Sequence, residues 1–232
     1  EIKKGDGIFV LNSYEVEKCR FNKNEKDYIL PYYTTKEISR YFINPQNQYW
    51  IIYSNRDVFS QIDDFPNIKI HLSKYSDVIT SVNKPYGLHR SRVQDIFRGE
   101  KILSIRKCAQ PSFSYVPFDS YVSRAFLIIK TERINLKYLS CILNSSTIKY
   151  WLRNKGKLQG NQFQVDMNPI MEIPIVKSEN VNSFLVLHDY LQFLNRLNEK
   201  IDLHVPNSHI IEIFEEIIDA MVMEIYFRQD FE

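Results

Sequence analysis

The sequence predicts an α+β protein whose first part mixes short strands with short helices and whose last part is a helical hairpin. Runs of aromatic and β-branched residues indicate strands, and apolar residues three and four positions apart indicate helices. The sequence pattern changes after Pro174, where the spacing of apolar residues becomes that of a heptad repeat. With 232 residues, 44% of them hydrophobic, the chain can bury a sizeable core. We therefore expect one domain over residues 1–176 and a helical appendage over residues 177–232.

The first third of the chain predicts three strands and a helix. Residues 5–11 indicate a turn that leads into a short buried strand, and residues 28–33 a strand broken at Pro31. The unbroken aromatic and β-branched run at 49–53 is typical of a central strand. Pro66 is expected to open a helix, because Ile68, Leu72, Tyr75 and Ile79 follow on one face. His71 lies beside that face and is expected to be a surface or satisfied histidine.

The middle of the chain predicts a short helix and two strands. Ser91 is a candidate cap for a helix that Gly99 ends. Residues 101–107 alternate as a strand does, and residues 121–129 indicate a second strand. Arg124 is the only charge in that second run, so it is either buried or directed outward. Two amphipathic helices are then expected around residues 136–143 and 148–152.

A polar stretch follows at residues 155–163, with two lysines, two glycines and three carboxamides. Such a composition makes a poor helix and a poor core strand, so we expect a loop. Lysine suits phosphate, and Gln and Asn match the edge of adenine in the major groove. The alternative is an ordinary solvated surface turn.

The last part of the chain predicts two antiparallel helices. Apolar positions in heptad-like spacing run from Phe184 to Leu194 and continue to Ile201, with Asn198 as one polar position. Residues 206–208 break the pattern, and a second apolar face runs from Ile210 to Ile225. These helices most simply form a hairpin. The alternative is that they are core helices of the preceding domain.

Charge is unevenly distributed along the chain although the net charge is only +2. Residues 1–83 carry 11 basic and 11 acidic side chains, residues 84–160 carry 15 and 4, and residues 161–232 carry 4 and 13. The middle block is therefore +11 and the last block −9. A block this basic indicates a polyanionic partner. The acidic last block is expected to face away from that partner or to touch another protein.

No constellation typical of an enzyme is present in the sequence. The Asn-Pro pairs at 44–45 and 168–169 lack the second proline and aromatic residue of an adenine methyltransferase loop. His204 and His209 lack a third metal ligand, and there is neither a metal-nuclease pattern nor a Gly-x-Ser-x-Gly motif. Three widely spaced cysteines argue against disulfides and zinc. We therefore expect a chain that binds rather than catalyses, cytoplasmic, without a metal and without a membrane partner.

The order of several short motifs resembles a known family. They are found at residues 5–10, 36–41, 65–68, 88–92, 101–103, 138–145, 155–160 and 173–175. Together they resemble the TaqI-like C-terminal specificity domain, the target recognition domain of Type II restriction-modification adenine methyltransferases, and are similar to Type I specificity subunit modules. The chain also begins at Glu1 rather than Met, so we expect a fragment of a longer protein.

The resemblance implies a β-rich mixed domain that contacts double-stranded DNA in the major groove. A methyltransferase domain of the same polypeptide or complex would flip and methylate the adenine, and the parent protein could also cleave DNA. S-adenosylmethionine is then expected in the parent, and no cofactor in this chain. The closing helices would space recognition modules or pack on the methyltransferase.

Nine side chains have chemistry that fits this role. For phosphates we expect Arg92, Lys107, Lys155 and Lys157, and for bases or the nearby backbone Arg40, Arg106, Gln159, Asn161 and Gln162. Two other functions stay open. One is a module for RNA or single strands that stacks bases on its 15 tyrosines. The other is a structural protein-interaction domain with the hairpin as its interface.

Overall fold

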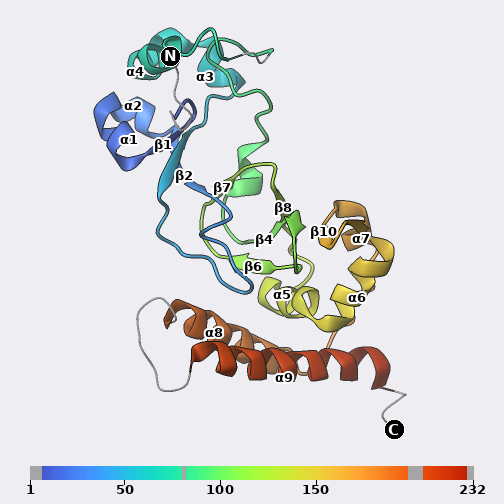
Figure 1. Cartoon of the computed structure of the whole chain (residues 1–232). Coiled ribbons are helices and arrows are strands. Elements are labelled where there is room, and N and C mark those ends of the chain that lie inside the picture. Colours follow the sequence, from blue (N-terminus) through green and yellow to red (C-terminus); the bar gives the residue numbers. More distant parts are fainter. Residues whose placement is uncertain (1–6, 80–81, 198–205, 229–232) are drawn as a thin grey trace. The chain divides into compact units, whose positions relative to one another are not determined.

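The structure is a computed structural model that describes residues 7–79, 82–197 and 206–228 (Figure 1). Two compact units share the chain. Unit 1 consists of residues 1–34, 45–98 and 119–122, and unit 2 of residues 35–44, 99–118 and 123–232. Each unit contains both strands and helices, so the predicted α+β class is confirmed.

Unit 1 is built on a four-stranded sheet with the order β1-β3-β2-β7. Its strands are β1 (Val10–Asn12), β2 (Ile29–Tyr33), β3 (Tyr49–Ile52) and β7 (Tyr121–Val122). The pairs β1–β3 and β3–β2 are antiparallel, and β2–β7 is parallel. The helices are α1 (Ser13–Cys19), α2 (Lys23–Lys26), α3 (Arg56–Ser60) and α4 (Pro66–Ser73), with 3₁₀ turns η1 (Ile62–Asp64) and η2 (Gln94–Phe97). Strand β3 is central, as its apolar run predicts.

Two buried polar side chains organise unit 1. The carboxylate of Glu25 accepts hydrogen bonds from the backbone N–H groups of Asn67 at 2.6 Å and Ile68 at 3.0 Å, so it caps the first turn of α4. Burial raises the pKa of Glu25, but these and neighbouring hydrogen bonds outweigh it and hold the pKa below its usual value. His71 is buried, with Nε2 2.9 Å from the carbonyl oxygen of Ile8. The prediction of a satisfied histidine is confirmed.

Four sequence predictions for local structure before residue 130 were wrong. Strand β2 continues through Pro31, which lies opposite Trp50; its parallel neighbour β7 pairs only from Tyr32 onward. Helix α4 ends at Ser73, before the last two apolar positions of the predicted face. The segment before Gly99 is a 3₁₀ turn without a side-chain cap, rather than a helix capped by Ser91. The predicted strand at 121–129 is two strands in two sheets, separated by a turn at residues 123–125.

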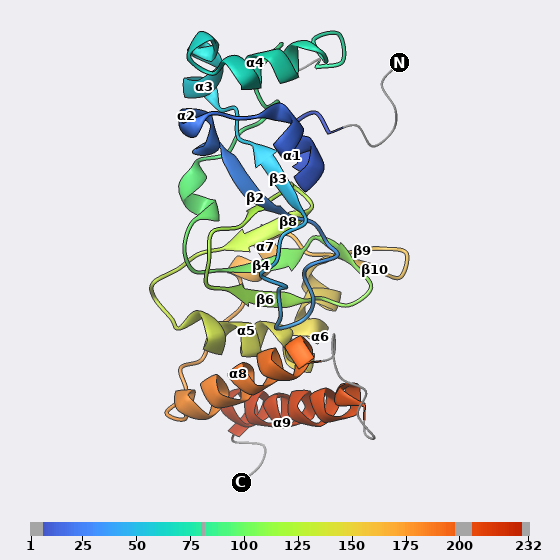
Figure 2. The same ribbon diagram turned by 90° about the vertical axis from the view of Figure 1, so that its left-hand side faces the viewer.

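The described residues of unit 2 form two three-stranded sheets and five helices, whose arrangement can be followed in Figures 1 and 2. The first sheet has the order β6-β4-β8, with β4 (Lys101–Ile105), β6 (Phe113–Val116) and β8 (Phe126–Ile129). The second has the order β5-β10-β9, with β5 (Lys107–Cys108), β9 (Lys157–Gln159) and β10 (Gln162–Gln164). The helices are α5 (Leu136–Asn144), α6 (Ser146–Lys155), α7 (Met167–Met171), α8 (Val181–Leu197) and α9 (Asn207–Phe227). All strand pairs in these two sheets are antiparallel.

Helix α5 is the central element of the unit 2 core. Asn135 caps its start, and Asn144 near its end exchanges two hydrogen bonds with the backbone of Phe113 in β6, at 2.9 and 2.7 Å. Ser145 ends α5 and caps α6, which explains the sharp junction between the two predicted helices. The buried residues of α5 and α6 share one apolar cluster with side chains of α8 and α9.

Helices α8 and α9 lie side by side and run antiparallel. The Asn207 side chain donates to the Leu194 carbonyl at 3.4 Å, and the rings of Tyr190 and Phe214 are 4.8 Å apart. The predicted hairpin is confirmed; its positions Asn198 and Ile201 lie outside the described residues. Both helices belong to unit 2, so they contribute to the same core as β4 and β6. The division of the chain into a domain over residues 1–176 and a helical appendage over residues 177–232 stays a prediction.

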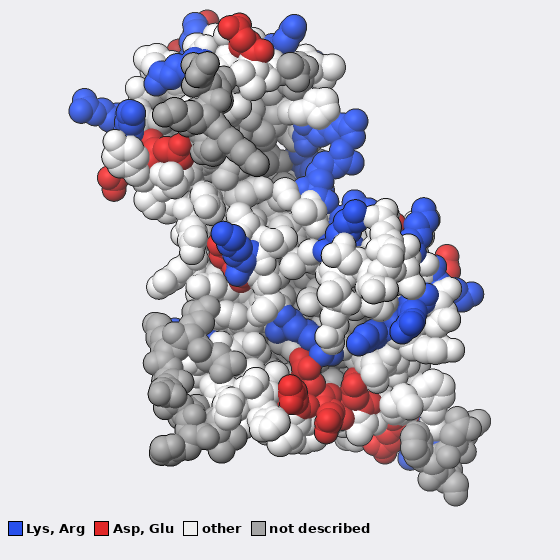
Figure 3. Space-filling view, viewed as in Figure 1, with Lys and Arg blue, Asp and Glu red and all other residues white. Residues whose placement is uncertain are grey.

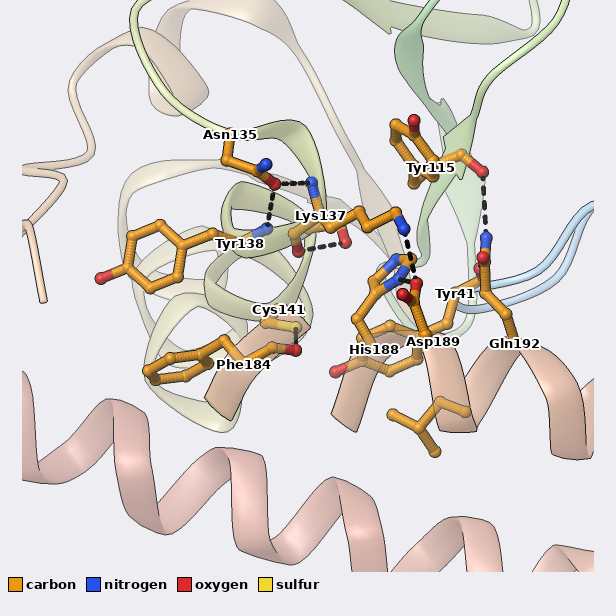
Figure 4. Close-up of polar contacts among 12 residues, drawn as sticks. Tyr41, Tyr115, Asn135, Lys137, Tyr138, Cys141, Phe184, His188, Asp189 and Gln192 are labelled. Atoms are coloured by element: carbon orange, nitrogen blue, oxygen red, sulfur yellow. Dashed lines mark hydrogen bonds and ion pairs between the residues drawn. The ribbon is translucent and has the colours of Figure 1, made fainter. Parts of the chain in front are cut away.

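Polar contacts fix α8 against the rest of unit 2 (Figure 4). His188 is fully buried between the rings of Tyr41 and Tyr115, and burial lowers the pKa of its imidazole to about 4. Asp189 pairs with Lys137 of α5 at 2.7 Å. Gln192 donates to the carbonyl groups of the same two tyrosines at 3.2 and 3.4 Å.

Candidate nucleic-acid interface

The stretch predicted as a loop at residues 155–163 is mostly a β-hairpin. Helix α6 ends at Lys155, and Gly156 follows with its N–H bonded to the Leu152 carbonyl; a Cβ at Gly156 would lie 2.5 Å from that oxygen. Strands β9 and β10 then pair through Gln159 and Gln162 across the two-residue turn Gly160-Asn161. Gly160 has φ +59°, as type II′ hairpin turns favour. The loop prediction was wrong because the polar composition of the stretch hides the two strands: most of their side chains are polar, and only Phe163 is buried.

The register of the β5-β10-β9 sheet divides its side chains between two faces. Residues directly opposite in an antiparallel sheet point to the same side, and neighbours along a strand alternate. Phe163 is opposite Leu158 and Cys108, and it is buried in the core cluster. The other face therefore carries five polar side chains: Lys107, Lys157, Gln159, Gln162 and Gln164. We call this the polar sheet face; all its members but Gln164 are classed as exposed.

A salt bridge lies beside the polar sheet face, where β4 passes into β5. The Arg106 guanidinium is 2.5 Å from one oxygen of Asp166, and the Gln164 amide nitrogen donates to the other oxygen at 2.8 Å. Backbone bonds fix the same point, because the Arg106 carbonyl accepts from Val165 and its N–H donates to Ala125. Arg106 is thereby held next to both sheets of unit 2.

A groove of about 390 Å³ opens at this junction. It is lined by Thr35, Ile105, Arg106, Lys107, Arg124, Ala125 and Gln164. Lys107 and Gln164 belong also to the polar sheet face, so groove and face form one continuous surface with cationic and carboxamide groups. Such a surface has donors for phosphate oxygens and paired groups for base edges.

The remaining predicted site residues have different surroundings. Lys155 lies 5.8 Å above the ring of Trp151, and Asn161 is exposed in the hairpin turn. Arg92 belongs to unit 1, where its backbone N–H and carbonyl both bond the hydroxyl of Tyr53. Arg40 pairs with Glu215 of α9 at 2.5 Å and donates to the Asn144 carbonyl. The guanidinium of Arg40 thus holds elements of unit 2 together, and it is not part of the proposed interface.

Charge separates within unit 2 as it does along the sequence. Figure 3 shows Lys and Arg side chains gathered in the region of α6 and β10, and Asp and Glu side chains gathered over α9. The carboxylates of α9 are Glu212, Glu215, Glu216, Asp219 and Glu224. Some of these carboxylates accept hydrogen bonds within unit 2. Asp219, for example, accepts one from the N–H of Ser146 at the start of α6.

Two side chains of this surface were not among the predicted site residues. Gln164 is two positions beyond Gln162 and shares its face, a relation that becomes visible only once the stretch is recognised as a strand. Arg124 had two possible orientations in the sequence, and the structure shows it exposed and lining the groove.

Metal-binding clusters and membrane-spanning helices are absent from the described part of the chain. Within residues 7–79, 82–197 and 206–228, no group of three His, Cys, Asp or Glu side chains could hold a metal ion, and no helix has the length and apolar character to cross a membrane. The cysteines are unbridged. Burial raises the pKa of each thiol, to about 11 for Cys108, so they behave as small apolar side chains.

Comparison with known proteins defines the family. The model of the TaqI-like C-terminal specificity domain matches residues 30–175, well over half of the chain. The chain belongs to this family, which confirms the resemblance seen in its short motifs. No match was found among curated protein sequences.

Among solved structures, the chain is similar to the Type IIL restriction-modification enzyme MmeI, whose structure was determined in complex with DNA. The TM-score is 0.65 and the identity 13%, so the likeness is one of fold. The match covers 95% of this chain and 31% of the MmeI chain.

Proposed function

We propose that this chain is a sequence-specific duplex DNA recognition domain of a restriction-modification protein. The observation that carries the proposal is the polar sheet face, where two lysines and three glutamines stand together beside a groove with two arginines. A two-stranded β-ribbon fits the major groove of B-form DNA. Membership in a specificity-domain family and the fold shared with a DNA-bound restriction-modification enzyme support the same function.

In this proposal the β9–β10 hairpin enters the major groove. The turn of the hairpin extends away from the rest of unit 2 in Figure 2, and residues 157–162 are exposed. Gln159, Asn161 and Gln162 would approach base edges, while Lys107, Lys155 and Lys157 would contact phosphates. Arg92 in unit 1 is proposed as a further phosphate contact.

We further propose that the parent protein methylates adenine at N6, and that its methyltransferase domain is a partner of this chain. For the partner, the supporting observation is a set of exposed apolar side chains on α8 and α9: Val186, Tyr190, Phe193, Ile213 and Ile217. Val186, Tyr190 and Phe193 line one hollow together with Phe214, and exposed apolar surface of this kind marks interaction sites. The acidic side chains of α9 would keep the same helices away from DNA.

Competition between nucleic acids tests the DNA proposal. A labelled 30-base-pair duplex of mixed sequence is titrated with the purified chain at low salt, and unlabelled duplex, single-stranded DNA and single-stranded RNA then compete for the complex. We expect duplex DNA to compete at least tenfold better than either single strand. Equal or better competition by single strands would favour the stacking module instead. A chain that binds none of the three at low salt would contradict the assignment.

A further inference from the structure

We propose that Asp166 is a positioning residue that holds Arg106 and Gln164 as a paired base-reading unit, Arg106 for guanine and Gln164 for adenine. The inference rests on the proposed function and adds to it a specificity-determining residue. Both oxygens of the Asp166 carboxylate are engaged, one with the guanidinium and the other with the amide. One side chain thus sets the place of two others that line the groove.

Asp166 lies where an Asp side chain usually caps a helix, but its carboxylate bonds Arg106 and Gln164 instead. Asp166 is the N-cap residue of α7, with the extended backbone of such residues, at φ −109° and ψ 161°. An Asp in this place usually turns its carboxylate to the first N–H groups of the helix. The Asp166 side chain makes no such bond. Its carboxylate is directed instead to Arg106 and Gln164, and so stabilises side chains of the groove rather than its own helix.

The carboxylate also fixes which way the Gln164 amide points. An ionised carboxylate only accepts hydrogen bonds, so the amide nitrogen must face Asp166 and the amide oxygen must face away. Gln159 and Gln162 are on the same sheet face, and within the described part of the chain neither makes a side-chain hydrogen bond. Gln164 is therefore held in place before any ligand arrives, whereas no side-chain hydrogen bond holds Gln159 or Gln162 in the described part of the chain. A preordered side chain loses less conformational entropy on binding.

The chemistry of the pair selects particular bases. The fork of an Arg matches O6 and N7 of guanine, and the oxygen and remaining N–H of a Gln match N6 and N7 of adenine. Arg106 retains guanidinium N–H groups besides the one that meets Asp166, and its side chain is 38% exposed. Because both side chains contact one carboxylate, and because guanine and adenine do not pair with each other, their base contacts must fall on neighbouring base pairs. We expect the recognised site to include an adjacent guanine and adenine.

Selection from a randomised duplex library tests the pair. Bound duplexes are sequenced for the native chain and for Gln164→Ala, Arg106→Ala, Asp166→Asn and the matched control Gln162→Ala. We expect Gln164→Ala and Arg106→Ala each to reduce base preference about tenfold at one of two neighbouring positions. Asp166→Asn should reduce preference at both positions together. Gln162→Ala should leave these two positions unchanged.

Two further measurements separate positioning from folding and from the function itself. Affinity for a random-sequence duplex should be no weaker in Asp166→Asn than in the native chain, and its thermal midpoint should stay close to the native one. Asp166→Glu, which keeps the carboxylate, should restore part of the preference at both positions. If the native chain selects a sequence but Asp166→Asn retains full preference at both positions, the inference is wrong while the proposed function stands. If the native chain binds no duplex, the proposed function fails, and the inference with it.

Discussion

At the scale of single residues, the buried side chain of His188 makes the free energy of unfolding depend on pH in the acidic range. Its pKa is about 4 in the fold and near the ordinary 6.5 when unfolded, so the unfolded chain takes up the proton first. The stabilisation is complete above pH 6.5 and is lost as the pH falls toward 4. The total loss is about 3 kcal/mol.

His188→Leu measures that contribution. Urea unfolding between pH 4 and 8 should show a shallower fall in the free energy of unfolding for the variant than for the native chain. The control is His209→Gln, which changes a histidine whose side chain is 75% exposed. Parallel pH profiles for the native chain and His188→Leu would contradict the argument.

Arg40 shows how a predicted DNA contact can have a structural role. Burial raises the pKa of Glu215, and the nearby guanidinium of Arg40 acts against this. Arg40→Ala would leave that carboxylate and the Asn144 carbonyl without their donor, at a cost of about 1–3 kcal/mol in unfolding free energy. We expect the thermal midpoint to fall and duplex affinity per folded molecule to stay within twofold. A variant with native stability and altered base preference would restore Arg40 as a base contact.

At the scale of elements, the β9–β10 hairpin depends on its turn. Gly160 has a positive φ, which costs an alanine about 1–2 kcal/mol. Gly99 is a close match, with φ +61° and open space around the position of a Cβ. Gly160→Ala and Gly99→Ala should therefore destabilise the chain similarly in thermal unfolding. Only Gly160→Ala should weaken sequence preference in duplex binding; equal effects on preference would argue against the hairpin as the reading element.

The same element shows what a sequence can and cannot predict. Helices α5, α6, α8 and α9 were predicted because each buries a regular apolar face. Strand β3 was predicted because its run of aromatic and β-branched residues is unbroken. Strands β9 and β10 bury mainly Phe163, so their alternation is almost invisible in the sequence. The run at 121–129 is apolar on both sides of its turn, and periodicity does not reveal that β7 and β8 join different sheets. Lys107 and Lys157 were predicted, whereas the shared face with Gln164 needed the register.

At the scale of the whole molecule, α8 and α9 complete the core of unit 2. Phe184, Leu191, Ile218 and Val222 are buried in one cluster with residues of α5, β4 and β6. A chain that ends at residue 176 should therefore lose cooperative thermal unfolding and bind a hydrophobic dye. If that fragment unfolds cooperatively at the native midpoint, the hairpin is a separable appendage, as the division at 176 predicts.

The central claim is that the polar sheet face binds the phosphates of duplex DNA. The most direct measurement is the salt dependence of affinity for a random-sequence duplex, compared between Lys107→Ala/Lys157→Ala and Lys23→Ala/Lys177→Ala. Both variants lose two exposed lysines, but only the first loses them from the polar sheet face. We predict that the slope of log affinity against log salt becomes shallower by roughly two in the first variant and is unchanged in the second. Equal slopes in the two variants would contradict the claim.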